Sequence, residues 1–137
     1  MHRIFERPLA PGLTEAIAGD NGVSAVGSSP IANLNVLSAG KRNGRHLDIS
    51  RFGEILESAR RRWRYVIVDL PPVHETKTAA RLASLCDGVV QVVEAESQPW
   101  EVAHRATNEL VSAHAQVLGV VLNKRRYPVP DWLYRRL

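Results

Sequence analysis

The sequence predicts an α/β fold in which a mostly parallel β-sheet is flanked by helices. Three short apolar runs rich in valine, at residues 65–68, 89–93 and 117–122, have the length of buried strands. Segments with apolar residues at helical spacing separate these runs. Strands that alternate with helices form βαβ units with a parallel sheet and right-handed crossovers. The 137 residues fit one domain, residues 1–137, without a repeat or an interdomain linker.

The first third of the chain predicts a helix, a loop and a short strand. Glycines bound the helix expected at residues 12–19. The small and polar residues 20–32 predict a loop. A short strand is expected at residues 34–38, ending at Ala39-Gly40.

A longer helix and a buried strand follow. Apolar residues recur at helical spacing over residues 48–63, and either Asp48 or Ser50 can cap that helix. The run Arg64-Tyr65-Val66-Ile67-Val68-Asp69-Leu70-Pro71-Pro72 predicts a strand buried on both faces, which the prolines end. Asp69 then lies at the carboxyl end of a central strand, where open α/β sheets bind ligands. This layout is typical of a Walker B segment, whose Asp organises Mg²⁺ and water beside a nucleotide phosphate.

The second half of the chain alternates helices with strands. A helix over roughly residues 75–86 precedes a buried strand at residues 88–94. Pro99 starts the next helix, at a position where its missing N–H costs nothing. A strand at residues 117–122 and a short helix at residues 130–137 complete the order.

Three polar residues follow the three predicted strands. They are Asp69, Glu94 and Asn123. Because parallel strands end at the same edge of a sheet, we expect the three side chains to converge on one site.

Composition restricts the class of protein. The net charge is +4, and a run of arginines at residues 60–64 could attract nucleotide phosphates, anionic lipid or nucleic acid, or could simply be a solvated helix end. Of these partners, nucleic acid is not expected. The single cysteine, Cys86, excludes an intrachain disulfide, and no apolar run reaches the roughly 18 residues of a membrane span. The cytoplasm is therefore the expected compartment.

The order and spacing of five segments resemble the ATPase domain of bacterial tyrosine autokinases, the cytoplasmic kinases of capsule and exopolysaccharide synthesis. The segments are residues 11–19, 33–40, 65–73, 86–93 and 117–123. They cover nearly the whole chain. The resemblance implies a P-loop NTPase-like fold of the partition-ATPase type.

The resemblance also implies roles for individual residues. Asp69 corresponds to the Walker B Asp, the catalytic candidate, which orders Mg²⁺ through water. Asn123 corresponds to a residue that reads the adenine edge in related folds; the alternative is a turn residue at a strand end. Glu94 faces either the nucleotide or the solvent. ATP and Mg²⁺ would be the cofactors of the complete domain, and tyrosine or water would accept the phosphoryl group.

The phosphate loop that this resemblance requires is absent from the sequence. That loop reads G-x-x-x-x-G-K-[ST]. In the one Gly-Lys pair, Gly40-Lys41, Arg42 follows where Ser or Thr is needed, and Asn35 replaces the first glycine. Each charge-assisted hydrogen bond to phosphate contributes roughly 1.5–3 kcal/mol. Losing several removes more than about 5 kcal/mol, or three decades of affinity. We therefore expect that the chain alone neither binds ATP tightly nor transfers phosphate.

The first strands of the fold are accordingly expected to be missing. The chain would then be the carboxyl portion of a longer reading frame, a degenerate relative kept for binding, or a chain that a second polypeptide completes. The implied function is a partial ATPase or tyrosine-kinase-type domain of exopolysaccharide or capsule synthesis. Its expected partner is a membrane-anchored chain-length regulator at the inner face of the membrane, with a homo-oligomer as the complete form. The alternatives are a non-catalytic interaction or regulatory module and a partition-type ATPase fragment.

Overall fold

The chain forms two compact units in a computed structural model that describes residues 4–19, 25–41, 47–97 and 99–125. One unit is Met1–Val68 and the other is Asp69–Leu137. Each unit is described by itself below. The expectation of one domain over residues 1–137 stays a prediction, and the helix expected at residues 130–137 lies outside the described residues.

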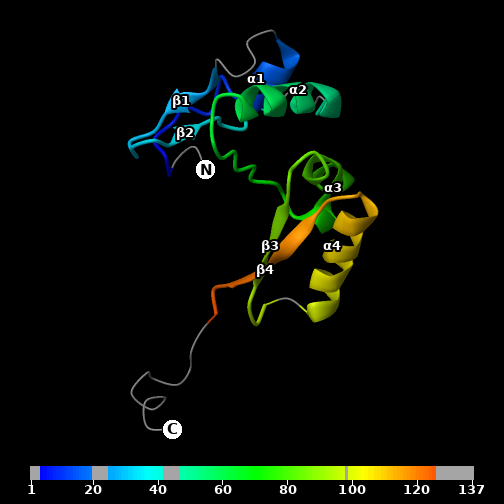
Figure 1. Cartoon of the computed structure of the whole chain (residues 1–137). Coiled ribbons are helices and arrows are strands. Elements are labelled where there is room, and N and C mark those ends of the chain that lie inside the picture. Colours follow the sequence, from blue (N-terminus) through cyan, green and yellow to red (C-terminus); the bar gives the residue numbers. More distant parts are fainter. Residues whose placement is uncertain (1–3, 20–24, 42–46, 98, 126–137) are drawn as a thin grey trace, which may run out of the picture. The chain divides into compact units, whose positions relative to one another are not determined.

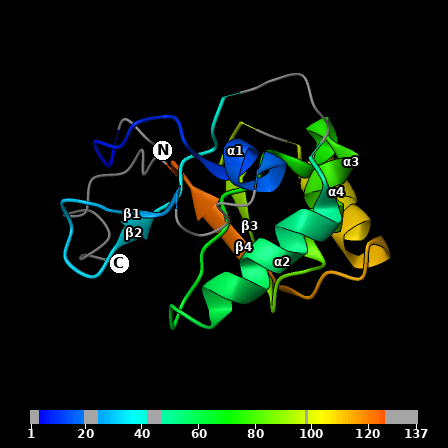
Figure 2. The same ribbon diagram turned by 90° about the horizontal axis from the view of Figure 1, so that it is seen from above.

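The first unit contains two helices and a small antiparallel sheet. Its elements are α1 (Leu13–Ala18), β1 (Gly27–Ser28), β2 (Asn35–Val36) and α2 (Ile49–Arg60). Both predicted helices are confirmed, and α1 lies beside α2 (Figures 1 and 2). The loop predicted at residues 20–32 is wrong at Gly27, which pairs with Val36 in β2. A two-residue strand has no hydrophobic period that could reveal it in a sequence.

Helix α2 begins where its sequence supplies a cap. The carboxylate Oδ1 of Asp48 accepts hydrogen bonds from the backbone N–H of Ser50 at 2.9 Å and from that of Arg51 at 3.2 Å. Asp48, rather than Ser50, is therefore the capping residue. The apolar side of the helix is buried through Phe52, Leu56 and Ala59. These contacts confirm the periodicity seen in the sequence.

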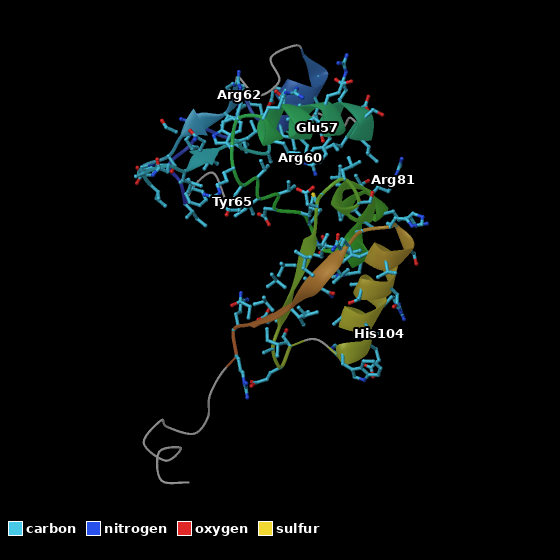
Figure 3. All side chains as sticks on the ribbon, in the orientation of Figure 1. Glu57, Arg60, Arg62, Tyr65, Arg81 and His104 are labelled. Carbon is cyan, nitrogen blue, oxygen red and sulfur yellow. The ribbon has the colours of Figure 1, made fainter. Side chains whose placement is uncertain are left out.

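The strand predicted at residues 65–68, before Asp69 and the two prolines, does not form. The chain between α2 and the next helix is extended, but it joins no β-ladder among the described residues. Two of its apolar side chains are almost bare, with Tyr65 77% exposed and Ile67 92% exposed. Tyr65 is labelled in Figure 3. A strand is stable only beside another strand, and the described chain supplies no neighbour for this one.

The second unit contains the parallel pair that the sequence predicts. Its elements are η2 (Val73–Glu75), α3 (Lys77–Ala83), β3 (Val89–Glu94), α4 (Trp100–Ser112) and β4 (Val117–Asn123). Strands β3 and β4 are parallel, and α4 is the crossover between them (Figure 1). Pro99 precedes α4 as its cap rather than its first helical residue.

A small apolar core holds the second unit together. It consists of Ala80, Ala83, Leu110 and Ala115. These residues bring α3 against α4, as the two views agree (Figures 1 and 2). Alanine dominates because two helices approach each other closely only over small side chains. Leu110, at 1% exposure, is the largest fully buried side chain among the described residues.

Helix α4 packs against β3 on one face of the two-stranded sheet. The side chain of Gln91 in β3 donates to the carbonyl of Ala103 at 3.0 Å and accepts from the hydroxyl of Thr107 at 2.7 Å. Both partners lie on α4. Val93, two residues along β3 on the same face, is 9% exposed. Strand β4 is largely exposed on both faces: Val120 and Leu122, the register partners of Gln91 and Val93, are 53% and 61% exposed.

Candidate functional site

Two of the three predicted site residues meet at the carboxyl edge of the sheet. Glu94 and Asn123 are register partners at the ends of β3 and β4. The backbone N–H of Ala95 donates to the carbonyl of Asn123 at 2.9 Å, which extends the ladder by one residue. The parallel pairing thus brings these two side chains to one edge, as the sequence predicts.

Local contacts engage both side chains at this edge. The amide Oδ1 of Asn123 accepts the backbone N–H of Lys124 at 2.9 Å. Lys124 has φ of 57°, and its ammonium group lies 3.1 Å from a carboxylate oxygen of Glu94. A left-handed residue directly after a strand is typical of a turn. These contacts favour the turn interpretation of Asn123, and its adenine-reading role stays a prediction.

Asp69 lies apart from this edge. Its neighbour Leu70 packs against the alanine-rich core together with Val89 and Val117, the first residues of β3 and β4. The chain at Asp69 is therefore near the amino ends of the two strands, opposite to Glu94 and Asn123. The expected convergence of three residues is wrong for the described structure. The cause is the missing ladder, since only a strand paired into the sheet would carry Asp69 to its carboxyl edge.

Asp69 alone offers few ligands to a metal ion. The side chain is exposed. Among the described residues no three His, Cys, Asp or Glu side chains gather closely enough to hold a metal. Mg²⁺ keeps several waters and usually combines one or two carboxylates with substrate phosphates. An exposed single carboxylate fits that arrangement only when a nucleotide supplies the remaining oxygens.

A carboxylate that the sequence argument missed organises the first unit. Glu15 accepts the backbone N–H of Gly12 at 2.8 Å through one oxygen and that of Lys41 at 2.9 Å through the other. The N–H groups of Lys41 and then Gly12 lower the pKa of Glu15 below its usual value. The G-x-x-E spacing from Gly12 to Glu15 was the available signal, because a residue at the third helical position can reach back to the cap.

The same contacts explain the Gly-Lys pair of the sequence. Gly40 has φ of +87°, and an added Cβ there would collide with the carboxylate of Glu15. The backbone N–H of Thr14 donates to the carbonyl of Ala39 at 3.0 Å, and that of Leu13 to the carbonyl of Ser38 at 2.7 Å. Gly40-Lys41 therefore anchors the start of α1.

Known proteins resemble this chain individually, although no family model matches it. It is 29% identical over 127 residues to the putative tyrosine-protein kinase CapB of Staphylococcus aureus, which covers 90% of this chain and 56% of the relative. It is 27% identical over 117 residues to the tyrosine-protein kinase CpsD of Streptococcus agalactiae, covering 82% of this chain and 51% of the relative. The chain thus spans about half the length of the curated relatives it matches.

Two solved structures also resemble this chain. The chimerical protein CapA2B2 superposes with a TM-score of 0.82 at 26% identity, over 93% of this chain and 58% of that one. The VpsO kinase domain gives 0.81 at 25% identity, over 92% and 64%. The chain therefore has the α/β fold of P-loop-type kinase domains, which confirms the predicted fold class. Its homologues are bacterial tyrosine-protein kinases, which confirms the resemblance found in the sequence.

No described helix has both the length and the apolar character needed to span a membrane.

Proposed function

We propose that this chain is part of an ATP-dependent tyrosine-kinase-type domain that serves exopolysaccharide or capsule synthesis. The observation that carries the proposal is the match to tyrosine-protein kinases over 82–90% of the chain, together with TM-scores above 0.8 to kinase-type structures. In the complete domain Asp69 orders Mg²⁺ through water. The acceptor of the γ-phosphate of ATP is a tyrosine of a neighbouring subunit or water.

The chain alone lacks the means to hold the phosphates. A phosphate loop supplies consecutive backbone N–H groups, a lysine and a metal-binding hydroxyl, and the sequence contains no such motif. In the nearest candidate, Gly40-Lys41, the carboxylate of Glu15 fills the space beside Gly40 and accepts a hydrogen bond from the backbone N–H of Lys41. Asp69 and Asn123 therefore contribute to nucleotide binding only after a phosphate loop joins them.

Calorimetry with Mg²⁺–ATP tests this part of the proposal. We expect a dissociation constant above about 1 mM for the purified 137-residue chain, because at least three decades of affinity are lost with the phosphate loop. The Asp69→Asn variant should bind no more weakly than the wild type under these conditions. Micromolar affinity of the wild-type chain would contradict the proposal.

The partner of the complete form is a membrane-anchored polysaccharide chain-length regulator, and the complete form is a homo-oligomer at the inner face of the membrane. A fused CapA2B2 chimera is among the structural relatives, which supports a partner of this kind. Co-purification with such a regulator from the native cell tests the assignment, and a regulator that never co-purifies would count against it.

A second candidate is a non-catalytic interaction module derived from the same fold. The exposed valines of β3 and β4 favour it, because monomeric proteins rarely leave a contiguous apolar strand surface bare. The discriminating measurement is phosphate transfer after a phosphate-loop segment has been supplied: a module remains inactive, whereas a split kinase gains activity.

A further inference from the structure

Three arginines lie close together just beyond the end of α2. We call Arg61, Arg62 and Arg64 the arginine cluster. The backbone N–H groups of Arg62 and Trp63 both donate to the carbonyl of Ala59, at 2.9 Å and 3.0 Å. This turn ends the helix and holds the cluster at its C-terminal end, within the first unit. All three side chains are exposed, and Arg62 is labelled in Figure 3.

The acidic side chains on the preceding turns of α2 are engaged with other arginines. Glu54 pairs with Arg51 at 3.0 Å, and Glu57 pairs with Arg60 at 2.6 Å. Within the described part of the chain, no ion pair involves a member of the arginine cluster. The cluster therefore brings three positive charges together without an acidic partner on the described residues.

The helix dipole accounts for Arg60 but not for the arginine cluster. Cations stabilise the last turn of a helix, and the effect falls off within that turn. Arg60 occupies the last turn of α2, whereas the cluster begins after it. Burying an unpaired charge is costly, so the three guanidinium groups need either water or a partner of opposite charge. Since a solvated helix end needs no such concentration of one charge, the cluster indicates an anionic partner.

Aromatic residues alternate with these arginines. Trp63 lies between Arg62 and Arg64, and Tyr65 follows directly. The guanidinium carbon of Arg64 lies 5.4 Å from the centroid of the Tyr65 ring. Tryptophan and tyrosine are enriched at membrane interfaces, where their rings sit at the level of the headgroups and basic side chains reach the lipid phosphates. This combination favours a lipid surface as the anionic partner.

We propose that the arginine cluster binds the anionic headgroups of a phospholipid membrane. The guanidinium N–H groups donate charge-assisted hydrogen bonds to the phosphate oxygens. This inference rests on the proposed function, under which the complete form lies at the inner face of the membrane. Anionic lipids of that leaflet attract basic segments. The contact orients the domain on the membrane in addition to any membrane-anchored partner.

Sedimentation with lipid vesicles tests this contact. The purified 137-residue protein is mixed with vesicles of phosphatidylcholine that contain phosphatidylglycerol, or with vesicles of phosphatidylcholine alone. We expect binding only where phosphatidylglycerol is present. Each basic residue near an anionic surface contributes about fivefold in affinity, so Arg61→Gln/Arg62→Gln/Arg64→Gln should bind about 100-fold more weakly. Wild-type binding should weaken between about 0.1 M and about 1 M salt, because the Debye length shortens.

The matched control removes the same number of positive charges from another part of the chain. The variant Lys77→Gln/Arg81→Gln/Arg105→Gln changes three exposed side chains of the second unit. It should bind the phosphatidylglycerol vesicles within about threefold of the wild type, because these charges lie outside the proposed contact.

A charge-conserving variant separates lipid binding from folding. Arg61→Lys/Arg62→Lys/Arg64→Lys keeps the three positive charges and should bind within about threefold of the wild type. All substitutions in the cluster lie beyond the last residue of α2, and circular dichroism checks that each variant keeps its helices.

Four outcomes overturn the proposal. They are no binding to phosphatidylglycerol vesicles, equal binding to both kinds of vesicle, equal losses in the two glutamine variants, and release of the bound protein by duplex DNA or inorganic phosphate where chloride of the same ionic strength releases none. The last outcome would assign the cluster to nucleic acid or to a soluble anion. The assay contains neither nucleotide nor partner, so its failure would leave the kinase-type assignment in place. Conversely, vesicle binding by a protein that transfers no phosphate after a phosphate loop is supplied would retain the lipid contact and remove the kinase function.

Discussion

Glu15 links two segments of the first unit that are far apart in sequence. Its two carboxylate oxygens accept backbone N–H groups from Gly12 and Lys41, and the left-handed Gly40 leaves the space that the carboxylate occupies. A carboxylate that accepts backbone hydrogen bonds is favoured in its ionised form, which is why the pKa of Glu15 is lowered. The start of α1 therefore depends on the charge of one side chain.

Glu15→Gln should lower the urea midpoint of unfolding at about pH 7, because the neutral amide accepts these two bonds less strongly. Since the folded-state pKa is lowered, the stabilisation is present above the unfolded-state pKa of about 4.5 and is lost as the pH falls through the folded-state pKa. The difference in midpoint between wild type and variant should therefore shrink toward about pH 3. The control Glu54→Gln alters an exposed pair with Arg51 and should have little effect. A difference that is independent of pH would contradict the assignment.

At the scale of elements, two hydrogen bonds fix α4 on β3. Gln91 donates to the carbonyl of Ala103 and accepts from Thr107, and both bonds lie in a partly buried interface. A glutamine within an otherwise apolar strand is explained by this pairing. The bonds set the height of α4 along the strand as well as its distance from the sheet.

Thr107→Val should destabilise the protein by about 1–2 kcal/mol, because it leaves the side-chain oxygen of Gln91 without its partner in a partly buried site. The double variant Gln91→Leu/Thr107→Val should be less destabilised than Thr107→Val alone, since replacing both partners leaves no orphaned group. Urea unfolding followed by circular dichroism measures the double variant and both single variants, Thr107→Val and Gln91→Leu. The control variant Thr78→Val in α3 should be destabilised less than Thr107→Val. A double variant whose loss equals the sum of the two single losses would exclude the coupling.

Local signals predicted most of these elements. Helical spacing gave α2, valine runs gave β3 and β4, and Asp48 marked the start of α2. The prediction of a strand at residues 65–68 was wrong because an apolar run specifies a strand only when a neighbour is present to pair with it. The prediction of the candidate site depended on strand pairing in the same way. Glu94 and Asn123 meet because β3 and β4 pair, whereas the segment of Asp69 pairs with no described strand and Asp69 stays apart.

At the scale of the whole molecule, the boundary between the two units falls at Val68 and Asp69, directly after the exposed stretch that contains Tyr65 and Ile67. Both units have helices with buried apolar faces, whereas this stretch has neither ladder bonds nor cover among the described residues. Proteases cleave extended, accessible chain more readily than helices.

Limited chymotrypsin digestion should therefore cut at Tyr65 before any other described aromatic residue. Trp100 is a suitable internal comparison, because it is 69% exposed and yet belongs to α4. Mass spectrometry of early time points identifies the order of cleavage. The Tyr65→Ala variant should lose this first cut while keeping the later ones. Cleavage at Trp100 ahead of Tyr65 would show that the stretch is protected.

The exposed valines of β3 and β4 also affect how long the protein survives in a cell. Exposed hydrophobic surface and unpaired strand edges make a protein prone to aggregation and to triage by chaperones and proteases, and the outer edges of the β3–β4 pair are unpaired among the described strands. Variants that keep the fold but place polar side chains at these positions should therefore be turned over more slowly than the wild type. The steady-state abundance of such variants would then exceed that of the wild type.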